Sequence, residues 1–308
     1  MKMTWTEAVK SSAGSLAADK LPVTALIAVR NEEANLRRCL EALAPAAHVV
    51  VVDSNSTDGT ARIAAAMGAE VVQFQYPGGY PKKRQWVLDQ DRIQTPWVLL
   101  VDADEVMPPA LWAEVRAAMN SAAPATAYLA KKEFHFLGRR FRFGGFSHSA
   151  VLLFRRGQAR FEDLLSNPPK AQDMEVHERL IVQGAVGRFH TPLIHEDFKG
   201  LDAYSLKHAH YASWEAAVRH QYLQSGRWGH QAIAARATGN AQEFRRFVKS
   251  LVIRMPGEGA MWFLYHYVVR LGFLEGRRGL IASQLRANYI REARAKLYEL
   301  QLRAGGAR

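Results

Sequence analysis

The chain has 308 residues, of which 48% are hydrophobic and 23% charged. This composition is typical of a folded globular protein with one large domain and an appendage, or two modest domains, and it excludes a largely disordered chain. The formal net charge is +12, and residues 236–308 hold 14 Lys and Arg against 5 Asp and Glu, so +9 of that charge lies near the C-terminus. Such an excess suits an anionic membrane surface, an acidic substrate or a nucleic acid.

The first 20 residues contain no continuous apolar core with a cleavage-like site after it, so we expect neither a signal peptide nor a membrane anchor, and a cytoplasmic protein. From residue 23 to about 120, apolar strands alternate with helical patterns, which predicts a βαβ sheet with parallel strands. Strands are expected at 23–29, 49–53, 70–74 and 96–101, and helices after Asn31, at 61–67, from Lys82 and from Pro108. The single cysteine, Cys39, excludes an intramolecular disulfide and falls among leucines, where we expect it to fill the core.

Beyond residue 125 the apolar segments are shorter and alternate, as at 128–136 and 150–154, which predicts antiparallel or mixed strands. From Leu201 onward helices are expected, one or two over 201–238 and another over 244–252. The apolar segment 261–274 is too short to cross a bilayer, which leaves a core or a surface position open. His208 and His210 are two residues apart on a predicted helix and face different directions, so they do not make a metal-ligand pair.

The segment with the clearest chemical meaning is 96–105, an apolar run that ends in Asp102, Asp104 and Glu105. The run predicts a buried parallel strand, and open α/β sheets bind ligands at the carboxyl ends of such strands. Clustered carboxylates there suit Mg²⁺ or Mn²⁺ bridging to a diphosphate. The alternative is a solvated acidic turn whose charges favour the N-terminus of the following helix.

Three motifs in order, at residues 31–33 (Asn-Glu-Glu), 50–60 (from Val50 to Thr60) and 101–105, resemble those of family 2 glycosyltransferases of the GT-A fold. More narrowly, segments 83–86, 204–217 and 272–280 resemble the bacterial subgroup that builds the lipopolysaccharide inner core and related envelope glycans. The resemblance implies an α/β, Rossmann-like, mostly parallel mixed sheet with flanking helices. It divides the chain into an N-terminal extension (1–21), a catalytic domain that binds a nucleotide sugar (22–200) and a C-terminal helical region (201–308) that could contact acceptor or membrane.

The resemblance also implies inverting transfer of a sugar from a nucleotide-diphosphate sugar, with a UDP-linked donor expected, to a lipid-linked or lipopolysaccharide-core acceptor. The ligands of a Mg²⁺ or Mn²⁺ ion would be Asp102, Asp104 and His195. The nucleotide sugar would be bound by Asn31, Glu32, Asp53, Ser54, Arg84, Asp102 and Ala103. Many relatives carry a second acid where Ser54 stands, which leaves the base contact open, and Arg84 has the alternative of an exposed basic helix start.

An inverting transfer needs a carboxylate that takes the proton of the acceptor hydroxyl. Glu178 is favoured, because it follows Gly144-Gly145 and a β segment in the order expected for the family, and Asp197 is the alternative. Glu178 could instead be a surface acid paired with an arginine. His195 could instead be a core histidine.

We expect the enzyme at the inner face of the cell membrane. There an apolar stripe of Phe244, Phe247 and Leu251 would meet lipid, and the adjacent Arg245, Arg246 and Lys249 would meet its anionic headgroups. The alternative is that this stripe packs against the catalytic domain as a brace. A nucleotidyltransferase lacks support because no glycine-rich triphosphate loop follows the first strand. A nucleic-acid-binding protein would leave residues 102–105 unexplained, so no nucleic acid partner is expected.

Overall fold

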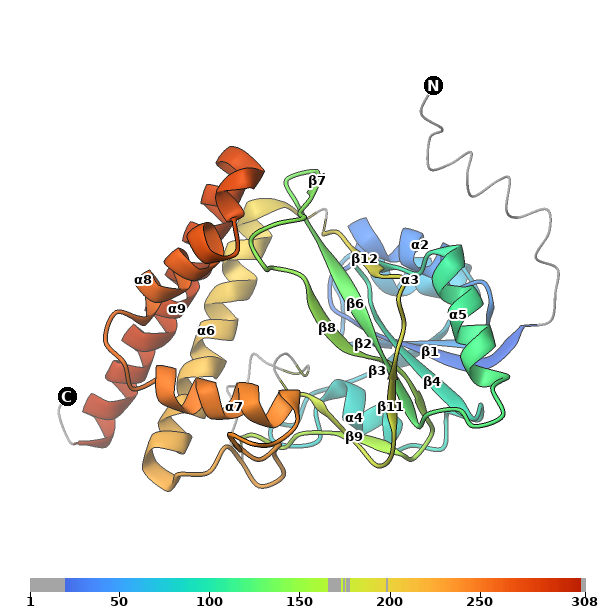
Figure 1. The fold of residues 1–308 in the computed structure, drawn as a ribbon. Coiled ribbons are helices and arrows are strands. Elements are labelled where there is room, and N and C mark those ends of the chain that lie inside the picture. The colour runs from blue at the N-terminus through green and yellow to red at the C-terminus, as the bar shows by residue number, and fades with distance from the viewer. Residues whose placement is uncertain (1–19, 166–172, 174, 176–177, 198, 306–308) are drawn as a thin grey trace.

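The computed structural model describes residues 20–165, 173, 175, 178–197 and 199–305 (Figure 1). The predicted extension, residues 1–21, lies almost wholly outside this part. Four parallel strands follow one another in the order β3-β2-β1-β4, namely β1 (Leu21–Val29), β2 (Ala46–Asp53), β3 (Glu70–Gln73) and β4 (Trp97–Asp102). In β1 only Pro22 is exposed, because helices cover both faces of the sheet. Those helices are α2 (Glu33–Glu41), α3 (Thr60–Ala66), α4 (Lys83–Leu88) and α5 (Pro109–Met119).

The sheet continues beyond β4 with antiparallel and parallel pairs. β8 (His148–Arg155) runs antiparallel to both β4 and β6 (Ala127–Phe136), while β11 (Val186–Arg188) and β12 (Leu193–His195) run parallel to β6. β5 (Glu105–Val106) closes the order as an antiparallel partner of β12. β7 (Arg139–Arg140) forms a hairpin with β6, and β9 (Ala159–Phe161) pairs separately with β10 (Leu180–Val182). This mixed sheet with flanking helices confirms the predicted GT-A-type fold class.

Two apolar cores lie on the two faces of the sheet. Neighbouring residues Leu26 and Ile27 belong to different cores, as the two-residue period of a strand requires. Ile27 packs in the core that contains the α2 and α5 side chains, and Leu26 in the core that contains Phe74 and Val87. Cys39 is 1% exposed within the first core, so its predicted role as core filler is confirmed.

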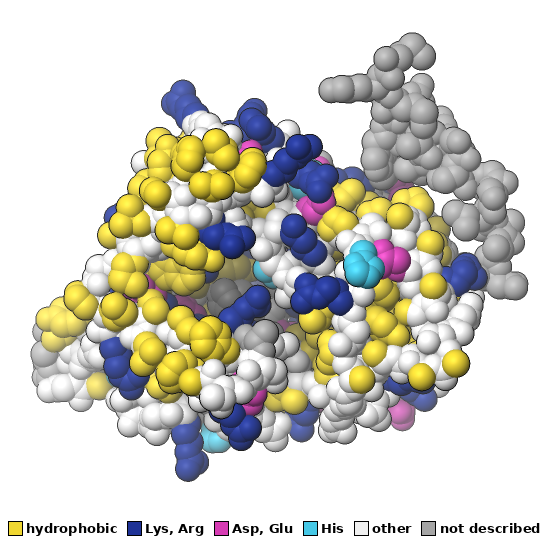
Figure 2. Space-filling view, viewed as in Figure 1, with side chains coloured by type: hydrophobic (Ala, Val, Ile, Leu, Met, Phe, Trp, Pro, Cys, Tyr) yellow, Lys and Arg dark blue, Asp and Glu magenta, His cyan; other side chains and the backbone are white. Residues whose placement is uncertain are grey.

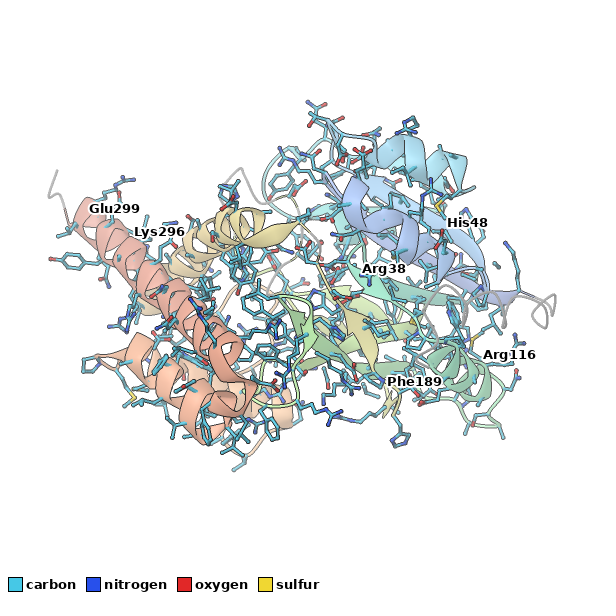
Figure 3. All side chains as sticks on the ribbon, turned by 90° about the horizontal axis from the view of Figure 1, so that it is seen from above. Arg38, His48, Arg116, Phe189, Lys296 and Glu299 are labelled. Carbon is cyan, nitrogen blue, oxygen red and sulfur yellow. The ribbon has the colours of Figure 1, made fainter. Side chains whose placement is uncertain are left out.

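The C-terminal part is helical, as predicted, and lies to one side of the sheet (Figure 1). Its elements are α6 (Gly200–Ser225), α7 (Ala241–Val252), α8 (Glu258–Leu264), the π-helix η1 (Tyr265–Val269), the 3₁₀-helix η2 (Gly272–Glu275) and α9 (Gly276–Ala304). Helix α9 lies beside α6, and Lys296 donates to the carbonyl of Ala209 at 2.8 Å (Figure 3). No helix among the described residues is long and apolar enough to cross a membrane.

Two helix boundaries differ from the sequence prediction. Helix α6 ends at Gly226, which adopts the left-handed conformation that glycine tolerates, so residues 226–238 are not helical. Helix α7 begins with a capping box, in which the Asn240 side chain accepts from the backbone of Glu243 and Glu243 accepts from that of Asn240. The apolar segment 261–274 is not one helix, because it passes from α8 through η1 to η2.

Buried ion pairs attach α7 to the rest of the molecule. Arg246 donates to Glu162 at 2.5 Å, with the two side chains 4% and 0% exposed, and Lys249 donates to Glu215 of α6 at 2.9 Å. Of the three basic side chains expected to flank a lipid-facing stripe, Arg246 and Lys249 therefore point inward, and Arg245 is the exposed one. The predicted contact of Arg246 and Lys249 with anionic headgroups is therefore wrong. Both side chains instead form ion pairs with acids that are distant in the sequence.

The two adjacent arginines of α7 provide a test of this assignment. Replacing Arg246 by Ala leaves Glu162 buried with two backbone donors but without the cation of its ion pair, and removing one member of a buried pair costs about 3–5 kcal/mol. We expect Arg246→Ala to lower the free energy of unfolding in urea by that amount. The matched variant Arg245→Ala should change it by less than about 0.5 kcal/mol, because that side chain is exposed. Equal effects of the two substitutions would contradict the assignment.

Candidate active site

The site is built at the carboxyl end of β4, where the chain turns sharply into β5. Glu105, which is 0% exposed, folds back so that its carboxylate accepts from the backbone N–H of Asp102 at 2.8 Å. Lys132 of β6 lies 2.5 Å from the other Glu105 oxygen. Burial, followed by the charge of Asp102, raises the pKa of Glu105 to about 7. Glu105 therefore fixes the turn that presents Asp102 and Asp104.

Two cations from different elements hold Asp102. Arg84 at the start of α4 pairs with one carboxylate oxygen, and Lys132 pairs with the other at 2.9 Å. Burial opposes the charge of Asp102, but Lys132 and Arg84 outweigh it and hold the pKa well below its usual range. Asp102 is thus an ionised carboxylate with a positive group on each side.

Asp104 lies against His195, as the strand register requires. β12 pairs with β5 so that His195 is opposite Glu105, and this brings the imidazole Nε2 to 3.2 Å from the Asp104 carboxylate. Lys207 of α6 approaches the same oxygen at 3.9 Å. Burial alone would lower the pKa of His195, but the charge of Asp104 and the hydrogen bond to it raise the pKa to about 9.

The residues fit a divalent cation as an open site. No cluster of three or more His, Cys, Asp and Glu among the described residues could enclose a metal. Asp104 and His195 form a pair of neighbouring ligand atoms, and Mg²⁺-type sites commonly use one or two carboxylates and take their remaining oxygens from substrate phosphates and water. Asp102 differs, because its oxygens contact Arg84 and Lys132.

The predicted nucleotide-binding residues lie on two loops that are joined to each other. Asn31, after β1, donates its N–H to the hydroxyl of Ser56, and its side chain accepts from the N–H of Thr57, after β2. Asp53 is 1% exposed and accepts from both Ser56 and Gln73. The neighbouring Ser54 hydroxyl is buried and lacks a hydrogen-bond partner among the described residues, so the loops leave a polar atom for a ligand.

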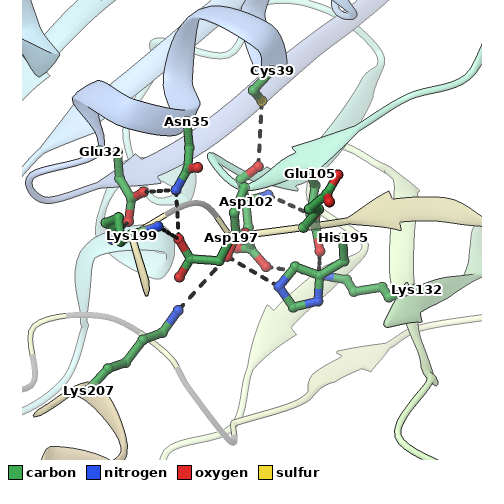
Figure 4. A network of polar contacts seen from close by, with 12 residues as sticks. Glu32, Asn35, Cys39, Asp102, Glu105, Lys132, His195, Asp197, Lys199 and Lys207 are labelled. Carbon is green, nitrogen blue, oxygen red and sulfur yellow. Dashed lines mark hydrogen bonds and ion pairs between the residues drawn. The ribbon is translucent and has the colours of Figure 1, made fainter. Parts of the chain in front are cut away.

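A second group of polar contacts continues from these loops to the end of β12 (Figure 4). The amide of Asn35 donates to both Glu32 and Asp197 at 3.0 Å, and Lys199 donates to Glu32 at 2.6 Å. The structure thereby brings Asp197, the alternative base, into one network with the predicted residue Glu32. His195, two residues earlier, contacts Asp104.

Glu178, the favoured base, lies beside the residue that precedes α4. It pairs with Lys82, immediately before α4, at 2.5 Å, and the two side chains are 4% and 5% exposed. Trp214 of α6 packs against the same lysine, whose ammonium lies 5.3 Å from its ring centre. The alternative of a surface acid paired with arginine is therefore wrong, because Glu178 is buried and paired with lysine.

Comparison with known proteins assigns a family to the segment that holds the carboxylates at the end of β4. Residues 24–167 match the model of glycosyl transferase family 2. Residues 24–167 therefore belong to family 2. The lipopolysaccharide core biosynthesis glycosyltransferase LpsC of Rhizobium meliloti is 29% identical over 214 residues, which are 68% of this chain and 74% of that protein. The uncharacterized glycosyltransferase Rv0539 of Mycobacterium tuberculosis is 40% identical over 85 residues, 28% of this chain and 38% of that protein.

Two solved structures show partial similarity. Glucosyl-3-phosphoglycerate synthase of Mycobacterium tuberculosis, solved with Mn²⁺, UDP and glucosyl-3-phosphoglycerate, is 23% identical with a TM-score of 0.30, over 45% of this chain and 50% of that one. Residues 1–349 of TarS from S. aureus are 17% identical with a TM-score of 0.41, over 89% of this chain and 92% of that one.

Several residues of the site were not predicted from the sequence. Lys132 and Lys207 reach Asp102 and Asp104 from β6 and α6, and no local pattern sets them apart from other lysines. Glu175 accepts from the backbone N–H groups of Arg84 and Gln85 and so caps α4 from outside. The signal for such a cap was present, because basic residues occupy the N-cap and the first two positions of α4, and its first turn has no acid.

The Asp104–His195 pair makes stability depend on pH in a defined direction. Because the folded-state pKa of His195, about 9, lies above the unfolded value of 6.5, protonated His195 stabilises the fold fully below pH 6.5, and that contribution disappears as the pH rises through 9. In metal-free buffer, wild type should exceed His195→Gln in free energy of unfolding by about 2 kcal/mol at pH 6, allowing for partial exposure. The difference should vanish near pH 9.5. A difference that grows with pH would contradict the pairing.

Proposed function

We propose that this protein is an inverting glycosyltransferase that moves a sugar from a nucleotide-diphosphate sugar, UDP-linked, to a lipid-linked or lipopolysaccharide-core acceptor. The carrying observation is that Arg84, Lys132 and Lys207 converge on Asp102 and Asp104 at the carboxyl end of β4, within the family 2 segment. Three cations at one strand end suit a diphosphate. The similarity to LpsC supports an acceptor of the lipopolysaccharide-core class.

The chain's own residues would handle the donor as follows. Arg84 and Lys132 turn from Asp102 toward the diphosphate, so that the positive groups already in place stabilise the negative charge that develops on the leaving group. Asp53, the Asn31 loop and the Ser54 hydroxyl, which has no hydrogen-bond partner in the described part of the chain, would hold the nucleoside at the ends of β1 and β2. Glu32 and the backbone of Ala103 would contact the nucleotide sugar between these loops and the carboxylates. The Ala103 side chain is 4% exposed, so only its backbone is available for this contact.

Asp104 and His195, joined by Asp102 once its cations turn away, would hold Mg²⁺ or Mn²⁺. The ion when bound neutralises the departing diphosphate. This use of Asp104 and His195 agrees with their separation of 3.2 Å. The imidazole must be neutral to serve as a ligand, so metal binding would release the proton that Asp104 holds on His195.

Glu178 is proposed as the base, and Lys82 gives the physical support. The Lys82 ammonium, 2.5 Å away, holds the Glu178 carboxylate in a fixed position beside α4, and a general base must be positioned in this way to take a proton. The pair sits beside α4, whose Arg84 reaches Asp102, and faces Trp214 of α6. In the transfer, the acceptor oxygen forms a bond to the anomeric carbon as the diphosphate leaves from the opposite face, and the acceptor proton passes to the carboxylate.

The donor assay tests the function directly. Asp104→Asn should lower the release of nucleoside diphosphate by about a hundredfold or more, because a neutral amide replaces the charged ligand. The measurement uses several nucleotide sugars with Mn²⁺ or Mg²⁺, and circular dichroism verifies the fold. Asp91→Asn, an exposed acid away from the site, is the matched control and should behave as wild type. Full activity of Asp104→Asn, or of wild type in excess chelator, would refute the metal role.

A second pair of variants separates the two candidate bases. Glu178→Gln should reduce turnover by about a hundredfold to ten-thousandfold, the range of general acid–base catalysis, while donor affinity measured by calorimetry stays the same. Asp197→Asn should have a smaller effect on turnover and should weaken donor binding, because it disturbs the Asn35 and Glu32 network. The reverse pattern would assign the base to Asp197.

The proposed location is the inner face of the cell membrane, where a lipid-linked acceptor would be found. On α7, Phe244 and Leu251 are exposed as a lipid-facing stripe requires, whereas Phe247 is half-buried. With Arg246 and Lys249 turned inward, this stripe lacks most of the basic rim that an anionic surface needs.

A further inference from the structure

We propose that the protein meets an anionic lipid surface through a different region, which we name the apolar edge and define as residues 137–143 and 264–278. This proposal deepens the proposed function, since it names the surface that would bring the site to a lipid-linked acceptor. The edge joins two parts of the chain that are far apart in sequence. They are the β6–β7 hairpin of the sheet and the connection from α8 through η1 and η2 to α9.

Large apolar side chains project from the edge into solvent. Val269 is 68% exposed, and the other exposed apolar side chains are Leu137, Phe143, Leu264, Tyr265, Val268, Leu271, Phe273 and Leu274. Figure 2 shows hydrophobic side chains gathered at the upper left, where Figure 1 places the start of α9 and the turn before it. A contiguous exposed apolar patch of this kind marks a surface that contacts a partner or a membrane.

The exposed charges of the edge have one sign. Arg142, Arg270, Arg277 and Arg278 are exposed beside the apolar side chains. Residues 137–143 and 264–278 are all described and contain one acid, Glu275, which is 3% exposed. An apolar patch with an entirely basic rim is complementary to anionic lipid, in which apolar groups enter the headgroup boundary and arginines meet phosphates.

The edge is held together as one rigid unit. Gly144 donates its N–H to the carbonyl of Arg270 at 2.7 Å, and Glu275 accepts from the backbone N–H groups of Arg142 and Phe143 at 2.7 and 2.9 Å. The carboxylate of Glu275 is thus buried within the edge, where its hydrogen bonds join the hairpin to η2. Below it, aromatic side chains of the hairpin pack against Ala282 of α9.

Two leucines show that the backbone supports this exposure. Leu137 and Leu271 have φ of 50° and 59°, the left-handed region that favours glycine, and both are exposed at turns of the edge. Such strained positions persist where the surrounding structure imposes them, and they cluster at functional sites. At a solvent-facing turn, glycine would adopt this conformation without strain, and a polar side chain would be solvated favourably. Leucine has neither advantage. Its exposed side chain is favourable there only if it contacts an apolar medium.

A second copy of the chain is the competing occupant, and the charges argue against it. A twofold contact would place the same surface against itself, so each basic rim would face another basic rim. Like charges brought together without counter-ions oppose association. Lipid supplies both the apolar area and the missing negative charge.

Vesicle co-sedimentation tests the proposal with the full chain. The probes are vesicles of phosphatidylcholine alone and of phosphatidylcholine and phosphatidylglycerol in equal parts, at low and high salt. Wild type should bind the anionic vesicles and bind them less at high salt. The apolar variant Val269→Ser/Phe273→Ser/Leu274→Ser should bind at least about tenfold more weakly. The charge variant Arg277→Gln/Arg278→Gln should lose about fivefold per arginine.

Matched controls carry the same chemical changes elsewhere. Phe244→Ser/Leu251→Ser removes exposed apolar side chains from α7, and Arg37→Gln/Arg188→Gln removes exposed arginines of the sheet part. Both should bind as wild type. Loss of binding in the α7 variant and not in the edge variants would overturn the proposal, as would failure of wild type to bind anionic vesicles.

Two further readings keep the outcomes distinct. Light scattering without vesicles should show the same mass for wild type and the apolar variant, and a wild-type dimer that the variant abolishes would assign the edge to a second copy instead. Release of nucleoside diphosphate in solution should be unchanged in all four variants. If wild type binds vesicles but cleaves no donor, the proposed function is refuted, whereas the proposal that the apolar edge binds anionic lipid is supported.

Discussion

The need to compensate the carboxylates at the end of β4 governs the arrangement of the whole molecule. Asp102, Asp104 and Glu105 lie within four residues in a largely buried turn, where unpaired charges are costly. Their cations come from four separate elements, with Arg84 from α4, Lys132 from β6, His195 from β12 and Lys207 from α6. Each of those elements must dock for the turn to be tolerated. The compensation therefore depends on the docking of β6, β12, α4 and α6 around the end of β4.

The same compensation prepares the site for a donor. Arg84 and Lys132 are already desolvated and directed at the strand end. A diphosphate that replaces Asp102 as their partner would therefore require little rearrangement of these side chains. Glu175, which caps α4, keeps Arg84 in place while its guanidinium changes partner. A helix without that cap would lose both its first turn and the direction of Arg84. The groups that stabilise the fold without donor are thus those best placed to stabilise charge during transfer.

How far the sequence predicts this structure depends on whether a signal is local. The strands β1 to β4 and the helices between them follow from apolar periodicity, and Cys39 from its leucine neighbours, because each pattern lies within a few residues. The pairing of β12 with β5 joins segments some ninety residues apart and has no local signal, although it places His195 beside Asp104. Arg245 and Arg246 are adjacent arginines that the local sequence does not distinguish. Arg246 is the buried one because Glu162 and Trp228, both distant in the sequence, contact its guanidinium.

Strand β6 links the carboxylates to the apolar edge and limits what acceptor can serve. Lys132 contacts Asp102, and Leu137, five residues further along the chain, lies in the edge. At about 3.3 Å per residue, an extended strand places these points roughly 16 Å apart. If the edge rests at the headgroup boundary, Asp102 stands above the membrane by at most about that distance. An acceptor whose reacting hydroxyl extends that far from its lipid could reach Glu178 or Asp197 without leaving the bilayer, whereas a hydroxyl at the headgroup itself would remain too low.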